Sequence, residues 1–333
     1  MKNIYKIMFI ITTIIGSVMT MSSSNWMMMW MGLEINLLSI IPLMSNTKNK
    51  MESEAAMKYF ITQAMASTAF MLSIIMLMTE TTNFKPVESI IMDSAMLMKM
   101  GAAPLHFWFP EVMEGLSLMN SMIMLTWQKM APMVVFMNLP KSTMMIIISI
   151  ISSMMISGIM GINKTSLRKI LAYSSINHIG WMLGAMLSNQ MTWMIYMTIY
   201  TITSINLVMV LNISKTLTMT QLINIMNKNK MMKLLYSMNF LSLGGIPPFI
   251  GFYPKWIVIM SMTEKQMYLL TFIMIISTLI TLLLYMRITF TSLTLTTSET
   301  IKIKKTTNNT LTMILNMMTL ISMMLCPLML TFM

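Results

Sequence analysis

The chain has 333 residues, of which 56% are hydrophobic and only 10% are charged, and its formal net charge is +12. Soluble domains carry about a quarter charged residues, so this composition excludes a water-soluble surface and makes the lipid bilayer the solvent for most of the chain. The single cysteine, Cys326, excludes thiolate-bound iron–sulfur clusters and cysteine-rich zinc sites within this chain, and the two histidines cannot form a four-ligand metal site alone.

Methionine takes the place of isoleucine and leucine throughout the apolar segments. The chain contains 54 methionines, and packing alone does not require so many. A metal site built on methionine would need histidine or cysteine beside it, and neither accompanies these residues. The composition therefore favours a codon bias like that of animal mitochondria over a functional role for methionine.

Eleven apolar runs are long enough to span a bilayer, which takes about 20 residues. In chain order they are 4–21, 25–44, 55–79, 88–109, 116–138, 142–162, 166–187, 191–213, 233–260, 267–290 and 308–331. The first follows Lys2 as in a signal peptide, but its length and the runs after it favour a first membrane helix. Because the polar connections are short, we predict an all-α polytopic membrane protein with one membrane domain over residues 1–333.

Basic residues gather in alternate connections, on the side of the N-terminus. Fifteen lie on that side: Lys2, Lys6, Lys48, Lys50, Lys164, Arg168, Lys169, Lys215, Lys228, Lys230, Lys233, Arg287, Lys302, Lys304 and Lys305. The other side holds only Lys85, Lys141 and Lys265. The positive-inside rule then predicts an inside N-terminus and, after an odd number of spans, an outside C-terminus. The basic residues form no compact patch, so nucleic-acid binding is not expected.

Four charged residues fall deep within the apolar runs: Glu34, Lys99, Lys129 and Lys255. A charge at the centre of a bilayer costs at least about 2.5 kcal/mol unless it is paired or hydrated, so such residues commonly serve transport. Snorkelling to the interface is an alternative for Lys99 and Lys255, whereas Lys129 and Glu34 lie far from both ends of their runs. A movable carboxylate among buried lysines can load and release protons, because it stabilises the charged lysine that burial disfavours.

The pattern Gly-x-x-Pro-x5-Pro occurs at 101–110 and again at 245–254, in the fourth and the ninth run. Glycine and proline break a helix, and broken helices that line a hydrated cavity are typical of transporters. A period of five runs is odd, so the second copy begins on the opposite side of the membrane. We therefore predict two inverted five-helix repeats, 1–138 and 142–290, and one extra helix at 308–331.

The charges do not follow this repeat. Lys99 precedes its motif, where the negative end of a helix dipole attracts a cation, whereas Lys255 follows its motif and matches Glu111. His178 has Ser174 four residues before it on the same helix face, so simple packing and a water-carrying face are both open. The same two interpretations, simple packing and a water-carrying face, apply to His106, just past the first break.

Six segments resemble the NADH dehydrogenase subunit 2 family, the antiporter-like membrane subunits of respiratory complex I, in its invertebrate mitochondrial form. The segments are 31–36, 99–108, 126–132, 172–181, 239–248 and 251–256. The resemblance extends over about residues 25–290. Bacterial members carry three further N-terminal helices, which this chain is expected to lack.

The resemblance implies a proton channel of two inverted units, coupled to quinone reduction elsewhere in the complex. The residues that would relay protons are Glu34, Lys99, Lys129, Lys255, His178 and His106. Glu34 and Lys99 would form the input pair, with Lys129 as the central relay. Lys255 would be the exit or transfer lysine, and the histidines would lie on the hydrated axis.

The same resemblance implies the surroundings of the chain. Its partners would be the other membrane subunits of complex I and the lipids of the mitochondrial inner membrane, with the N-terminus in the matrix and the C-terminus in the intermembrane space. NADH, FMN, iron–sulfur clusters and ubiquinone would belong to the complex, and no cofactor or redox centre is expected on this chain. The chain would thus be a subunit of a proton-translocating NADH:ubiquinone reductase.

Two alternatives remain open from the sequence. One is a free-standing cation/proton antiporter, since such proteins are similar to this family. The other is a structural scaffold subunit whose polar axis is vestigial.

Overall fold

The computed structural model describes residues 2–46, 49–78, 85–140, 142–226, 230–247 and 249–294. Within these ranges the regular secondary structure is helical, apart from an isolated bridge between Ser166 and Thr218. The chain divides into two compact units, residues 1–153 and 154–333, and each is described by itself. The prediction of an all-helical chain is confirmed for the described residues.

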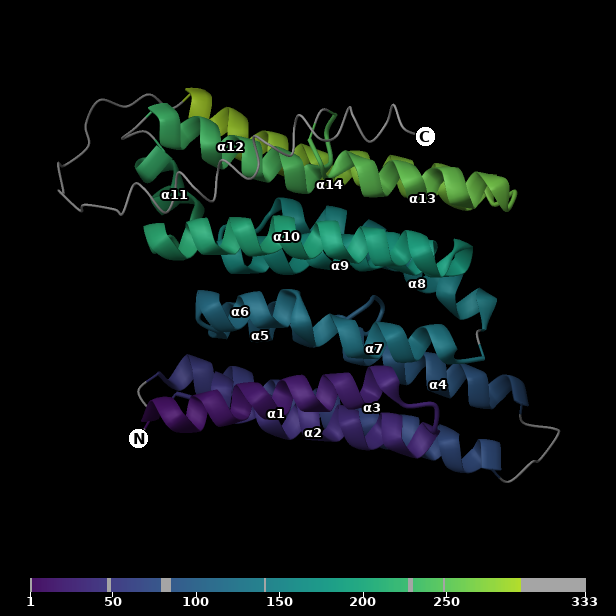
Figure 1. Ribbon diagram of the computed structural model, residues 1–333. Helices are drawn as coiled ribbons and strands as arrows, with labels where there is room; N and C mark the ends of the chain where they lie inside the picture. Colours follow the sequence, from purple (N-terminus) through teal and green to yellow (C-terminus); the bar gives the residue numbers. More distant parts are fainter. Residues whose placement is uncertain are drawn as a thin grey trace. The chain divides into compact units, whose positions relative to one another are not determined.

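The helices of the first unit follow the predicted apolar runs (Figure 1). They are α1 (Lys2–Ser22), α2 (Trp26–Met44), α3 (Lys50–Met78), α4 (Lys85–Met100), α5 (Trp108–Gly115), α6 (Leu118–Leu125), α7 (Trp127–Asn138) and α8 (Thr143–Ile162), the last of which continues into the second unit. α1 packs on α2, α3 packs on α4 and α5, and α4 packs on α7. This packing brings the middle of α2 and α3 together with the end of α4 and the start of α7.

The second unit is built around a helix that is buried on almost every side. Its helices are α9 (Leu167–Ser188), α10 (Gln190–Ser214), α11 (Met219–Met226), α12 (Lys230–Gly244), α13 (Phe252–Glu264) and α14 (Tyr268–Thr294). α9 packs on α10, α13 and α14, and its polar residues Ser175, Asn177 and His178 are buried. A helix surrounded in this way presents polar groups to its neighbours and not to lipid.

Six helices in the described residues are long and apolar enough to cross a membrane: α1, α2, α3, α8, α10 and α14. The runs at 88–109, 116–138 and 233–260 are each divided between two shorter helices. α9 has 22 residues, but it carries the polar stretch 173–178 that lowers its hydropathy. The predicted run 308–331 lies outside the described residues.

The two Gly–Pro breaks have the same local backbone. Gly101 and Gly245 have φ of 74° and 75°, a left-handed conformation that glycine adopts without strain. The amide after each glycine donates to the carbonyl five residues earlier, at 2.9 Å after Gly101 and 3.4 Å after Gly245, which closes the helix end. The chain resumes a helix seven residues after each glycine, at Trp108 and at Phe252.

The sequence does not predict the division of 116–138 between α6 and α7. Thr126 joins them with φ −110° and ψ −74°, and its hydroxyl donates to the carbonyl of Met122 at 2.8 Å. Threonine hydroxyls compete with the helical hydrogen-bond pattern in this way. Lys129 therefore lies in the first turn of α7 and not in the middle of a continuous helix. The short helix α11 is likewise not predicted.

Candidate functional site

Two side-chain amides join α2 to α7 inside the first unit. Asn36 Nδ2 donates to Gln128 Oε1 at 3.0 Å, and Gln128 Nε2 donates to Asn36 Oδ1 at 3.1 Å. The hydroxyl of Tyr59, from α3, donates to the same Gln128 oxygen at 3.4 Å. Both amides are buried, so their mutual pairing satisfies groups that would otherwise lose their hydrogen bonds to water.

A small polar cavity lies beside this amide pair. Its volume is about 20 Å³, which is enough for one water molecule. Five polar residues line it: Asn36, Tyr59, Gln63, Lys99 and Gln128. Such a water would have the two to four polar partners that an internal water needs. The cavity brings Lys99 next to the amide pair.

Lys99 occupies the last turn of α4, as the sequence predicts, and it is only 6% exposed. Glu34, on α2, is half-buried and is the carboxylate that interacts electrostatically with Lys99. Among the described residues no ion pair joins the two groups directly. The input pair is therefore not joined by an ion pair in the described residues, and its role stays a prediction.

Lys129 is the most deeply buried of the three lysines, at 2% exposure. Its ammonium lies 5.1 Å from the centre of the Phe109 ring, which belongs to α5. An aromatic face attracts a cation, and this attraction offsets part of the cost of burial. The ring that contacts Lys129 of α7 therefore belongs to α5, which begins just after the first helix break.

His106 lies in the connection between α4 and α5 and is 2% exposed. Its Nδ1 is 3.2 Å from the carbonyl oxygen of Pro104, and its ring centre lies 4.5 Å from that of Phe107, with the two rings tilted by 32°. These partners are local to the break. The contacts described for His106 thus lie within the segment 104–107.

In the second unit, His178 of α9 contacts two tyrosines of α10. Its Nδ1 lies 2.8 Å from the Tyr196 hydroxyl, and its ring centre lies 4.9 Å from that of Tyr200. Asn177 donates to the hydroxyl of Thr281 on α14 at 3.2 Å. These contacts join α9 to both neighbours through polar groups. Both sequence-based interpretations of His178 remain compatible with them.

Lys255 points back across the second helix break. It belongs to the first turn of α13, and its ammonium donates to the carbonyl of Gly244, the last residue of α12, at 2.7 Å. A Cβ at Gly245 would lie 2.9 Å from that ammonium and 3.0 Å from the carbonyl oxygen of Gly251, and the positive φ of this position also favours glycine. Lys255 is 7% exposed, so its side chain is buried within the second unit.

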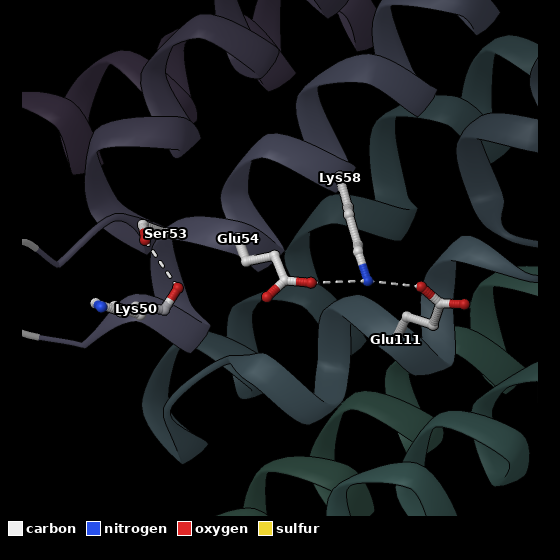
Figure 2. Close-up of polar contacts among 5 residues, drawn as sticks. All are labelled: Lys50, Ser53, Glu54, Lys58 and Glu111. Carbon is white, nitrogen blue, oxygen red and sulfur yellow. Dashed lines mark hydrogen bonds and ion pairs between the residues drawn. The ribbon is translucent and has the colours of Figure 1, made fainter.

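Glu111, at the position in the first motif that matches Lys255, has a different role. Lys58 of α3 lies between two carboxylates, 3.2 Å from Glu54 and 2.9 Å from Glu111 (Figure 2). The three side chains are 43%, 59% and 58% exposed. Ion pairs at such exposure are worth about 0–1 kcal/mol. The two helix breaks are alike in backbone but not in the charges that follow them.

Some polar partners escaped the sequence-based prediction. The pairing of Asn36 with Gln128, and of His178 with Tyr196, joins different helices, and no local pattern reveals such pairs. Tyr196 and Tyr200 do share one face of α10 at a spacing of four, which is a signal that the sequence carries. Within the described ranges, no group of three or more His, Cys, Asp or Glu side chains could hold a metal ion.

Buried lysines at the breaks of helices, within an all-helical apolar chain, define an antiporter-like membrane protein. The sequence profile of the NADH:quinone oxidoreductase/Mrp antiporter membrane family matches residues 23–281. The chain belongs to this family, and the resemblance seen in its motifs is confirmed.

Curated relatives and solved structures agree with this assignment. NADH-ubiquinone oxidoreductase chain 2 of Anopheles gambiae is 48% identical over 297 residues, which cover 87% of this chain and 86% of the relative. The Locusta migratoria protein of the same name is 38% identical, with 96% and 95% covered. A chain of respiratory complex I from Thermus thermophilus superposes with a TM-score of 0.83 at 19% identity, covering 96% of this chain and 78% of that one.

A second solved structure has the same fold. A chain of the Mrp complex from Dietzia superposes with a TM-score of 0.72 at 16% identity, covering 84% of this chain and 59% of that chain. At such identities these likenesses establish a shared antiporter-like fold.

Proposed function

We propose that this chain is a proton-translocating membrane subunit of a mitochondrial NADH:ubiquinone oxidoreductase. The observation that carries the proposal is the 48% identity, over most of both chains, to a protein named as chain 2 of that enzyme. The chain assembles with the other membrane subunits in the inner membrane. NADH, FMN, iron–sulfur clusters and ubiquinone belong to the rest of the complex, and this chain contributes no redox centre.

In the first unit, protons would enter at Glu34 and Lys99 and pass to Lys129. Three features support this order: the electrostatic interaction of Glu34 with Lys99, the water-sized cavity beside Lys99, and the burial of Lys129 on α7. Gln128 lines the cavity and directly precedes Lys129, so it links the cavity to the helix that carries the relay lysine. A water held there would carry a proton between groups that do not touch.

In the second unit, Lys255 and His178 would continue the relay. Lys255 is buried against a carbonyl that accepts a hydrogen bond but no proton, so its proton must leave by another route. His178 and Tyr196 are hydrogen-bonded and can each donate or accept. His106, held by Pro104 in the first break, would join the relay only through water.

We also propose that the chain crosses the membrane eleven times as two inverted five-helix repeats and one extra helix. The matching backbone of the breaks at Gly101 and Gly245 supports the repeat. In this arrangement the paired helices α4/α5, α6/α7 and α12/α13 each count as one span. The N-terminus would then face the matrix and the C-terminus the intermembrane space.

The experiment that tests the function replaces Lys129 with methionine in the assembled complex. A positioned proton donor accelerates proton transfer by at least about 10²-fold, so Lys129→Met should reduce proton pumping and coupled NADH oxidation by about tenfold or more. Native electrophoresis should show normal assembly, because methionine retains the apolar stem of the lysine. The matched control is Lys265→Met, an exposed lysine outside the relay. Unchanged pumping in Lys129→Met, with intact assembly, would favour a structural scaffold.

A cation/proton antiporter is the second candidate, and the likeness to the Mrp complex chain favours it. The two functions differ in whether the chain works alone. Reconstituted by itself in liposomes, an antiporter would exchange sodium for protons across the membrane. A subunit of the oxidoreductase would instead pump only within the complex, during NADH oxidation.

A further inference from the structure

Asp93 is a buried carboxylate that the proposed relay does not use. It belongs to α4, six residues before Lys99, and its side chain is fully buried. Its Oδ2 accepts a hydrogen bond from the backbone amide of Ser142 at 2.8 Å and a second one from the Ser142 hydroxyl. Hydrogen bonds to a charged acceptor are stronger than those between neutral groups. A carboxylate thus joins α4 to the residue just before α8.

The start of α8 suits a carboxylate. The amide of Ile146 donates to the Ser142 carbonyl at 3.2 Å, so Ser142 caps the first turn of this helix. Amides at this end have no acceptor within the helix, and the helix dipole attracts negative charge there. Asp93 supplies both an acceptor and a negative charge at that place. The cost of a carboxylate in an apolar chain is therefore offset locally.

A second contact joins the same two segments farther along. Ser152 of α8 donates to the carbonyl of Ala103 at 3.0 Å, and also to a carbonyl of its own helix at 3.3 Å. Ala103 lies in the first helix break, ten residues after Asp93, and Ser152 lies ten residues after Ser142. The equal spacing shows that the two segments run in the same direction. Lys99 lies between the two attachment points along the chain.

The end of α4 is held from other sides as well. The Trp108 indole donates to the Met98 carbonyl at 3.1 Å, and the Gln63 amide of α3 donates to the Lys99 carbonyl at 3.4 Å. These bonds fix the last turn of α4 beside α3 and α5, whereas the two contacts with α8 fix its position along that helix. Of the side chains that make these contacts, only that of Asp93 is charged.

A direct role as a proton carrier is the alternative for Asp93, and its surroundings disfavour that role. With a rise of 1.5 Å per residue, Asp93 lies about 9 Å from Lys99 along the helix axis, which is beyond the reach of a hydrogen bond. Ser142 donates to Asp93 from both its amide and its hydroxyl, and a backbone amide takes up no proton. These contacts hold two helices together and favour a positioning role.

We propose that Asp93 is a positioning residue for Lys99. By binding the start of α8, it sets the height of α4 and with it the place of the Lys99 ammonium at the small polar cavity. The inference rests on the proposed function, because it assigns a role within that proton relay. A displacement of about 1 Å in a reacting group can cost roughly 100-fold in rate, so a contact away from the chemistry can control it.

The test measures proton pumping during NADH oxidation, per amount of assembled complex. Asp93→Ala removes both bonds to Ser142, whereas Asp93→Asn keeps an oxygen that can accept them. Ser142→Ala removes only the hydroxyl and retains the amide. The matched control is Ser153→Ala, because Ser153 is a buried serine of α8 whose hydroxyl donates to a carbonyl of the same helix, that of Ile150, at 2.9 Å.

Asp93→Ala should reduce pumping by about tenfold or more, because Lys99 is displaced. Ser142→Ala should reduce pumping less, and Ser153→Ala should leave it unchanged. Asp93→Asn should recover most of the pumping that Asp93→Ala loses. An equal loss in Asp93→Asn and Asp93→Ala would indicate a proton carrier and overturn the proposal. Unchanged pumping in Asp93→Ala would overturn it as well.

A second background separates positioning from a merely structural role. A residue that acts through Lys99 has no effect once that lysine is replaced. The double variant Lys99→Met/Asp93→Ala should therefore retain the same residual pumping as Lys99→Met. A further loss, by the factor that Asp93→Ala causes alone, would show that Asp93 acts independently of Lys99 and would refute the positioning role.

Lys129→Met, measured in the same membranes, distinguishes failure of this inference from failure of the proposed function. Loss of pumping in Lys129→Met together with full pumping in Asp93→Ala refutes only the role of Asp93. Full pumping in both variants refutes the relay as well. If Asp93→Ala does not assemble, Ser142→Ala decides, and pumping equal to that of Ser153→Ala would overturn the proposal.

Discussion

At the residue scale, the amide pair of Asn36 and Gln128 is the most specific polar contact of the first unit. Each amide donates one hydrogen bond to the other, at 3.0 and 3.1 Å, so the two side chains fix the orientation of α2 against α7. Glu34 and Lys129 belong to these same two helices, two residues before Asn36 and one after Gln128. In the proposed relay, the pair would therefore position the two charged residues beside it.

The pair leads to a prediction about stability. Gln128→Leu leaves the Asn36 amide buried without its partner and should destabilise the chain by about 1–3 kcal/mol, the cost of an unsatisfied buried polar group. Adding Asn36→Leu removes the unsatisfied group, so the double variant should be less destabilised than the sum of the two single variants. Thermal unfolding of the purified complex in detergent measures all four states of this cycle. Strict additivity would contradict the pairing.

At the scale of elements, the two helix breaks share a backbone and differ in what surrounds them. Each has a glycine with positive φ, an amide that donates five residues back, and a helix that resumes seven residues later. A Cβ added at Gly101 would lie 3.2 Å from the Phe109 side chain and 3.4 Å from that of Trp108, whereas a Cβ added at Gly245 would lie 2.9 Å from the ammonium of Lys255. The same break thus supports an aromatic cluster in one unit and a cation in the other.

Alanine at each glycine separates these two roles. Both Gly101→Ala and Gly245→Ala place a side chain at positive φ, which costs roughly 1–2 kcal/mol. Only Gly245→Ala also puts a Cβ 2.9 Å from Lys255 Nζ and displaces it from the Gly244 carbonyl. We expect similar losses in thermal stability, but a larger loss of proton pumping in Gly245→Ala. Equal pumping in both variants would contradict a role for the position of Lys255.

Sequence patterns predict the elements better than the contacts between them. Both breaks follow from glycine and proline, and the buried α9 follows from an apolar run with Ser174, Asn177 and His178 within it. The division at Thr126 does not follow, because threonine is also common inside helices and only the bond to Met122 shows its effect here. The sequence also does not predict that the Lys255 side chain points to the Gly244 carbonyl, since a long side chain can reach either the membrane surface or a backbone carbonyl.

In the candidate site, too, the sequence predicts some residues and not others. The free-energy cost of a charge in a bilayer is enough to identify Glu34 and the three buried lysines as candidate site residues, because the apolar runs contain few other charged residues. The groups that support them, such as Gln128 and Tyr196, are uncharged, and their partners lie on other helices far along the chain. Their roles depend on packing, which a single sequence does not specify. The relay itself stays a prediction until pumping is measured in variants.

At the scale of the whole molecule, the distribution of basic residues predicts which ends of the helices face the matrix. Lys215 follows α10, and Lys265 precedes α14, and both side chains are exposed. In the orientation that the positive-inside rule predicts, Lys215 would lie in the matrix and Lys265 in the intermembrane space.

Labelling with a membrane-impermeant amine reagent tests this orientation. In mitoplasts, where only the outer face is accessible, Lys265 should be modified and Lys215 should not. In inverted inner-membrane vesicles the pattern should be reversed, and peptide mass spectrometry would locate the modified lysine. Modification of Lys215 in intact mitoplasts would contradict the proposed orientation.

The hydrogen bond from Lys255 to the Gly244 carbonyl has a consequence for charge balance. Lys99 is set near a carboxylate, so loss of its proton would leave a net negative charge beside α4. Lys255 is set on a backbone carbonyl, so loss of its proton would leave a neutral site that attracts no counter-cation. The acceptor also cannot be removed by changing any side chain, because every residue at position 244 supplies the same oxygen. The two units would thus discharge their protons into different electrostatic surroundings, one anionic and one neutral.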